Sequence, residues 1–151
     1  MKQEEFLAKL DRQALLDAIN RAENACSGEV RIHVQPKASG GELRWVAERT
    51  FERLGMAKTA SRTGVLLFIA SEEQRFVILG DKGINDLVPA DFWDEIAARL
   101  TERFKAGEFS GGIVAAVDAV GEKLRTFFPL GPDDRDELSD ELSIGTHTDS
   151  P

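Results

Sequence analysis

The sequence predicts an α/β fold, a three-layer α/β/α sandwich around a small mixed β-sheet. Three observations support this prediction. Two strand patterns are separated by a helical pattern, a third strand pattern follows the second after a short polar turn, and the other apolar residues recur at helical spacing. A helix between two strands favours a right-handed crossover, so the first two strands should be parallel and the third antiparallel beside the second.

The first helical segment spans residues 6–22, where apolar side chains recur every three or four positions. Asp11 is a candidate cap within it, so the segment is one helix or a broken pair. Residues 29–35 then alternate strictly between apolar and polar side chains. This alternation predicts a strand, with His33 on its half-exposed polar face.

The helix that should connect the parallel strands covers residues 43–54, with Trp45 near its apolar face, where core packing is expected. Residues 65–70 are a continuous apolar run, which is typical of a central strand covered on both faces. Residues 75–79 are a third strand pattern after a short polar turn. These last two strands should therefore form an antiparallel hairpin.

Two further helices should complete the packed domain, which we expect to span residues 1–130. Residues 86–104 have an apolar helical face, with Pro89 in the first turn. Residues 110–127 form the last helix, for which Ser110 is a candidate N-cap.

The C-terminal segment, residues 131–151, has a different composition from the rest of the chain. It holds seven acidic residues against one arginine, and few large apolar residues. This composition predicts a disordered acidic tail, although Leu138, Leu142 and Ile144 could dock on the domain.

The overall charge excludes some partners. The 19 lysines and arginines stand against 27 acidic residues, a net charge of −8, so neither a nucleic acid nor an anionic membrane surface is an expected partner. The single cysteine excludes an intrachain disulfide. Because no apolar run has the length of a membrane span or secretory signal, we expect a soluble protein in the cytoplasm.

Polar residues should converge at the edge of the sheet where the two parallel strands begin and the antiparallel strand ends. They are Ser27, Glu29, Ser61, Arg62, Thr63, Asp81 and Lys82. Asp81 and Asp86 lie on one glycine-hinged turn, and such hard oxygen ligands suit Ca²⁺ or Mg²⁺, with Glu29 as a third carboxylate. Alternatively, Asp81 and Asn85 satisfy turn and cap amides, and Asp86 starts a helix.

Arg62 has two interpretations, an anion-binding residue or an ion-pair partner of Asp81. His33 is more typical of a strand-face residue than of a catalytic base. No nucleophile motif, phosphate-binding glycine loop or Cys-His pair occurs in the sequence. The catalytic residues are therefore unassigned, and whether the protein is an enzyme is left open.

Several short motifs occur along the chain in a definite order. They are Ala22-Glu23 with residues 27–31, residues 62–67, residues 80–85, Phe104 with residues 107–112, and residues 136–138. From about residue 10 to 130, their order and spacing resemble the TPM domain family, and the Gly80-Asp81-Lys82-Gly83 turn is similar to its cytosolic bacterial branch. The resemblance implies a three-layer α/β/α fold and Ca²⁺ or Mg²⁺ binding near the loops at the sheet edge.

Three functions are compatible with these features. The favoured one is a TPM-like module that binds a divalent cation and a protein partner. The alternative is a metal-assisted acid phosphatase for phosphomonoesters, an activity attributed to a plant branch of that family, with Asp81 and Asp86 holding the metal and Arg62 steadying the phosphate. A third is an interaction domain whose acidic tail binds a basic partner or covers the site. The oligomeric state is unassigned.

Overall fold

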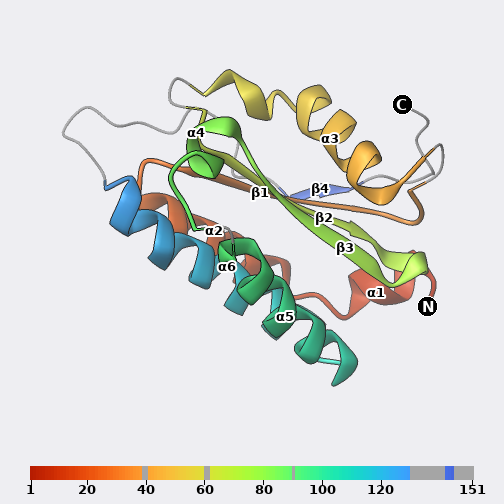
Figure 1. Ribbon diagram of the computed structural model, residues 1–151. Helices are drawn as coiled ribbons and strands as arrows, with labels where there is room; N and C mark the ends of the chain where they lie inside the picture. Colours follow the sequence, from red (N-terminus) through yellow and green to blue (C-terminus); the bar gives the residue numbers. More distant parts are fainter. Residues whose placement is uncertain (39–40, 60–61, 90, 130–141, 145–151) are drawn as a thin grey trace.

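The computed structural model describes residues 1–38, 41–59, 62–89, 91–129 and 142–144. Figure 1 labels the helices and strands along the chain. They are α1 (Gln3–Ala8), α2 (Arg12–Ala25), β1 (Glu29–Gln35), α3 (Leu43–Arg53), β2 (Gly64–Ala70), β3 (Arg75–Gly80), α4 (Lys82–Asn85), α5 (Phe92–Lys105), α6 (Phe109–Phe127) and β4 (Leu142–Ile144), with short 3-10 turns at Met56–Lys58 and Ser71–Glu73.

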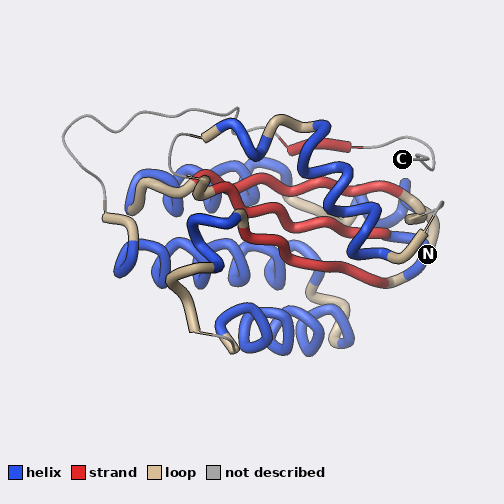
Figure 2. Tube along the Cα trace, turned by 45° about the horizontal axis from the view of Figure 1, so that its top comes forward, coloured by secondary structure: helices blue, strands red, loops and turns tan. Residues whose placement is uncertain are grey.

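The sheet has the strand order β3-β2-β1-β4 and is mixed, as predicted. Strands β1 and β2 pair in parallel from Glu29 opposite Gly64 to Gln35 opposite Ala70. Strands β2 and β3 form the expected antiparallel hairpin. Helices α2, α5 and α6 cover one face of the sheet and α3 covers the other, which gives three layers (Figures 1 and 2).

The period of the strands divides the apolar residues between two cores. Val30, Ile32 and Val34 of β1 pack toward α2, α5 and α6, whereas Leu66 and Phe68 of β2 pack toward α3. Every residue of β2 is buried, because helices cover both of its faces. The continuous apolar run of this strand therefore has the physical cause expected from the sequence.

The helix boundaries decide one open alternative and differ from the predictions at two places. The first segment is the broken pair, because the Asp11 side chain accepts a hydrogen bond from the Ala14 N–H at 3.0 Å and starts α2. Ser110 does not cap α6, which begins at Phe109; its hydroxyl instead accepts the Asp11 N–H at 3.0 Å. The side chain of Ser110 thus joins two helices that are distant in sequence.

The helix expected over residues 86–104 begins only at Phe92. Asp86 ends the short helix α4, and the Val88 N–H donates to the Ile84 carbonyl at 3.1 Å. Proline disfavours helical backbone at the residue before it, so Pro89 separates α4 from α5 and does not open a single long helix.

The acidic tail contributes one strand to the sheet. In β4, Ser143 lies opposite His33 and Ile144 opposite Val34, in parallel register. Leu142–Ile144 therefore lie against the domain, which is the arrangement that the sequence left open for this part of the tail. Leu138 and the other tail residues lie outside the described residues. No helix in the described part of the chain has the length and apolar content needed to cross a bilayer.

Candidate functional site

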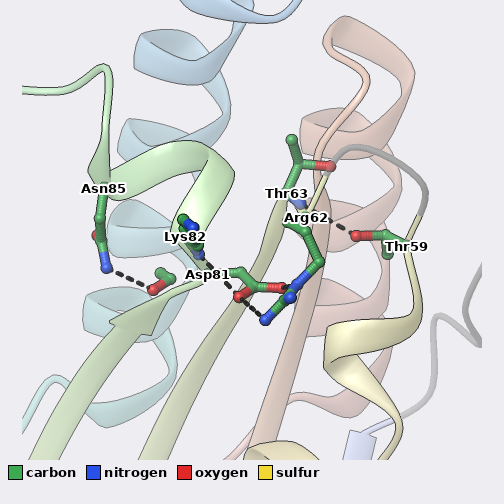
Figure 3. A network of polar contacts seen from close by, with 7 residues as sticks. Thr59, Arg62, Thr63, Asp81, Lys82 and Asn85 are labelled. Atoms are coloured by element: carbon green, nitrogen blue, oxygen red, sulfur yellow. Dashed lines mark hydrogen bonds and ion pairs between the residues drawn. The ribbon is translucent and has the colours of Figure 1, made fainter.

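Polar residues meet where β1 and β2 begin and β3 ends, as the topology predicts (Figure 3). The Thr63 hydroxyl donates to the Ser27 carbonyl at 3.3 Å, and the Glu29 N–H donates to the Thr63 carbonyl at 3.1 Å. On the other side of β2, the Asp81 N–H donates to the Gly64 carbonyl at 2.9 Å. One hydrogen-bonded network therefore joins the three strands at this edge. Ser61 lies outside the described residues.

Arg62 and Asp81 form the centre of this network. The Nε and Nη2 of Arg62 donate to the two carboxylate oxygens of Asp81 at 2.7 Å and 2.8 Å. The Asp81 side chain is only 5% exposed, whereas that of Arg62 is 49% exposed. The hydrogen bonds from Arg62 to Asp81 and the negative charge of Asp81 raise the pKa of Arg62. Of the two interpretations of Arg62, the ion pair is the arrangement present.

Asp81 also starts the turn that follows β3. Its carboxylate accepts the Lys82 N–H at 2.7 Å as the N-cap of α4, and the Gly83 N–H donates to the Arg62 carbonyl at 2.9 Å. Arg62 has a φ of 55°, in the left-handed region that is unfavourable for a residue with a Cβ. The surrounding contacts thus hold a strained backbone at the residue that pairs with Asp81. No sequence pattern indicated this strain.

A second contact clamps the far end of the turn. The Asn85 side-chain amide donates to the Gly80 carbonyl at 2.8 Å, and its oxygen accepts the indole N–H of Trp93 at 3.0 Å. A Cβ at Gly80 would overlap the Trp93 ring, so only glycine fits there without movement of the indole. Asn85 therefore holds the turn through a carbonyl and an indole N–H, and not through a turn amide as predicted. The role of Trp93 was missed, because its apolar surroundings indicated only core packing.

A hollow of about 570 Å³ opens beside this ion pair, between α3 and the end of β3. Arg44, Arg49 and Arg62 line it together with Trp45 and Trp93. Trp45 is 43% exposed, which contradicts the core position expected for it, because the buried stripe of α3 leaves it on the flank of the helix. The Arg49 guanidinium lies 5.7 Å from the centre of the Trp45 ring, which places a cation-π contact in the wall of the hollow. Three acids, Glu48, Glu52 and Asp81, line the hollow as well.

The structure does not assemble the three predicted metal ligands into one group. Asp86 is exposed at the end of α4, and Glu29 is buried at the start of β1. Glu29 and Asp81 are two strands apart, about 10 Å between Cα atoms at ordinary strand spacing. Among the described residues, no group of three or more His, Cys, Asp or Glu side chains could hold a metal ion.

The oxygens of Asp81 and Asp86 are of the type that Ca²⁺ and Mg²⁺ prefer. However, the Arg62 guanidinium lies where a cation bound by both oxygens of Asp81 would lie. The donor atoms therefore suit these ions, whereas their arrangement suits the ion pair.

His33 is buried, which contradicts the half-exposed position predicted for it. Its Nδ1 lies 2.9 Å from the Ser143 hydroxyl and its Nε2 lies 2.8 Å from Gln35 Oε1. The Gln35 amide nitrogen donates to the Lys37 carbonyl at 2.8 Å, so Oε1 must accept and the neutral ring carries its hydrogen on Nε2. Strand β4 supplies the second partner. The ring is thus part of a buried hydrogen-bonded chain, which no local pattern around His33 could reveal.

Comparisons with known proteins place the chain in a family. A model of the TPM domain matches residues 1–123. A comparison with curated proteins found no match. The solved structure of BA42 from the psychrophilic bacterium Bizionia argentinensis is 41% identical over 89% of this chain and 92% of that chain, with a TM-score of 0.83.

The N-terminal domain of the cg2496 protein from Corynebacterium glutamicum is similar in fold. Its TM-score is 0.59 at 13% identity, over 74% of this chain and 69% of that chain. The family match covers the region from α1 to within α6, including the turn that carries Asp81. The chain belongs to the TPM domain family.

Proposed function

We propose that the protein is a cytoplasmic binding module that takes a divalent cation, Ca²⁺ or Mg²⁺, at the turn after β3 and also binds a protein partner. One observation carries the cation proposal. The nearly buried Asp81 carboxylate is held by the turn and already has a cationic group, the Arg62 guanidinium, against both of its oxygens. A carboxylate in that environment favours a positive charge beside it.

The proposed ligands are Asp81 and Asp86 from the turn, with Glu29 as the third carboxylate of the set. Asp81 stays in place without Arg62, because its main chain bonds to Gly64 and its carboxylate caps α4. Arg62 can leave, since half of its side chain lies in water. A bound cation would neutralise the carboxylates of the turn in place of the guanidinium.

This exchange makes a specific prediction for a two-dimensional amide NMR titration with Ca²⁺ and then Mg²⁺. Shifts should concentrate in residues 80–86 and near Glu29. Arg62→Gln removes the competing charge and should strengthen cation binding, whereas Asp81→Asn should abolish it. Asp94→Asn is the matched control, because Asp94 is an exposed acid on α5. Absence of shifts in the turn, or unchanged affinity in Arg62→Gln, would contradict the proposal.

A metal-assisted acid phosphatase is the second candidate. The observation that favours it is that three arginines, Arg44, Arg49 and Arg62, line the 570 Å³ hollow, beside an equal number of acids. Arginines are suited to the oxygens of a phosphomonoester, and Arg62 would be the anion-binding residue. In that function the metal would be held by Asp81 and Asp86. Hydrolysis of p-nitrophenyl phosphate with Mg²⁺ that survives Asp81→Ala would show a contaminating activity and remove this candidate.

A further inference from the structure

Strand β3 is an outer strand of the sheet, and its free edge carries backbone groups that β2 does not use. Asp81 donates its N–H to Gly64, and bonding alternates along an antiparallel pair, so the N–H and C=O groups of Phe76 and Ile78 point away from β2. Within the described residues these groups have no backbone partner. The Gly80 carbonyl also points outward, but the Asn85 side chain already bonds it and so ends the free edge there.

This edge lies at the bottom of a groove. Hollows of about 820 Å³ and 570 Å³ follow β3 from Arg75 to Asp81 and share Ile78 and Trp93 in their walls. Helix α3 forms one wall and α5 forms the other, with β3 between them (Figure 1). The groove thus offers backbone hydrogen bonds at its base and side-chain contacts on both walls.

The opposite edge of the sheet is the short strand β4. Residues Leu142–Ile144 of the chain add to β1 as a parallel strand. An open strand edge promotes aggregation, and natural proteins cover or block such edges unless they use them for binding. The edge of β3 is covered by none of the described residues. Strand β4 has three residues and β3 has six, so β3 presents the longer open edge to another molecule.

The charges on the walls indicate what kind of segment fits. The larger hollow is lined by Arg44, Arg75 and Lys105 against one acid, Asp94, whereas arginines and acids are equal in number in the smaller hollow. The excess of positive charge therefore lies in the larger hollow, beside the first half of β3. Side chains of an added strand would point alternately toward α3 and toward α5. Acidic side chains suit Arg44 and Arg75, whereas the wall formed by α5 presents Trp93 and further apolar side chains.

We propose that the edge of β3 is a strand-addition site for an extended segment of a partner protein in which apolar and acidic residues alternate. The segment becomes a fifth strand of the sheet, bonded to the outward groups of Phe76 and Ile78. This inference rests on the partner-binding part of the proposed function and names its surface. It does not depend on the cation.

The test uses the full chain, in the presence of a chelator, and a synthetic peptide as long as β3 in which isoleucine and glutamate alternate. Amide NMR should show shifts along β3, and hydrogen exchange at the Phe76 and Ile78 amides should slow down. A peptide of alternating isoleucine and lysine is the control and should bind more weakly. Reversing two rim charges, Arg44→Glu with Arg75→Glu, should weaken binding of the glutamate peptide by about tenfold.

The matched control variant carries Arg12→Glu and Arg125→Glu, which change the net charge equally but lie on α2 and α6. It should bind the glutamate peptide as the unmodified chain does.

Equal binding of both peptides, unchanged exchange at Phe76 and Ile78, or no binding would overturn the proposal. Shifts confined to β1 and β4 would mean that the peptide displaces the tail instead. Concentration-dependent shifts along β3 without peptide would identify a second copy as the occupant. If the chain binds no cation, the strand-addition site is not contradicted. If the peptide does not bind, the cation site is not contradicted.

Discussion

Replacing Asp81 by alanine should loosen the turn that joins β3 to α4. The carboxylate accepts hydrogen bonds from Arg62 Nε at 2.7 Å, Arg62 Nη2 at 2.8 Å and the Lys82 N–H at 2.7 Å. Loss of an N-cap acceptor costs about 1 kcal/mol. The ion pair adds a modest amount, because solvent screens the half-exposed arginine. We expect Asp81→Ala to lower the free energy of unfolding by about 1–2 kcal/mol and Tm by about 3–8 °C.

Urea unfolding followed by far-UV circular dichroism measures this change through the transition midpoint, and the slope should stay constant. Asp81→Asn keeps an oxygen that can accept the Lys82 N–H, so it should cost less than half as much as Asp81→Ala. Asp86→Ala removes an exposed acid from the same turn and should change stability by less than about 0.5 kcal/mol. If Asp81→Ala is no more destabilising than Asp86→Ala, the carboxylate does not hold the turn and the argument for the site fails.

Three further predictions concern packing, burial and the tail. A Cβ at Gly121 would lie 2.7 Å from the Cα and Cβ of Ala22, so Gly121→Ala should cost about 1–3 kcal/mol by forcing α6 away from α2. A Cβ at Gly111 in the same helix would meet only a side-chain atom at 3.8 Å, so Gly111→Ala should raise the free energy of unfolding by about 0.5–1 kcal/mol. Urea unfolding measures both variants, and a change of the same sign in the two free energies of unfolding would contradict this packing. Burial raises the pKa of the Cys26 thiol above its ordinary value of 9.0. The stability that the neutral thiol contributes is therefore present below pH 9.0 and is lost as the pH rises above 9.0. The free energy of unfolding of the unmodified chain should fall more steeply above that pH than that of Cys26→Ala. Parallel pH profiles of the two chains would refute the prediction. Deleting residues 142–151 uncovers the edge of β1 and should lower the free energy of unfolding by about 1 kcal/mol or more, and an unchanged Tm would show that β4 contributes nothing.

The strands of the sheet were predictable because their patterns are local. The alternation over residues 29–35 and the apolar run at 65–70 each predicted a strand, and the structure has a strand at both places. The alternation did not report which faces are covered, because β1 is buried on both faces except at Arg31. The parallel order followed from the helix between them. The break between α4 and α5 was not predicted, since the apolar spacing continues through Pro89 and hides the change of direction. Apolar spacing therefore indicates which side chains are buried, but it does not show whether one helix or two carry them.

The position of His33 shows why local patterns fail for distant pairing. Leu142 and Ile144 indicated that the tail could dock, but three residues do not reveal which strand they join, because that strand, β1, lies more than a hundred positions earlier. The partner of His33 Nδ1, Ser143, therefore comes from a distant strand, and the Phe68 ring lies 5.4 Å from the imidazole ring. At the candidate site, by contrast, part of the arrangement could be predicted from the sequence. Pairing of Arg62 with Asp81 was one of two predicted arrangements, because strand order alone brings them to the same edge of the sheet.

The turn after β3 and the free edge of β3 share a boundary, so binding at one proposed site can change the affinity of the other, although each can exist without the other. Asn85 bonds the last outward carbonyl of β3, at Gly80, and also bonds Trp93, which lines both hollows. A cation that shifts α4 through Asp81 would therefore move the group that ends the free edge. Linkage then requires that a strand bound to β3 changes the affinity of the turn for a cation by the same factor as the cation changes the affinity for the strand. Equal cation affinities with and without the peptide would mean that Asn85 separates the two sites instead of coupling them.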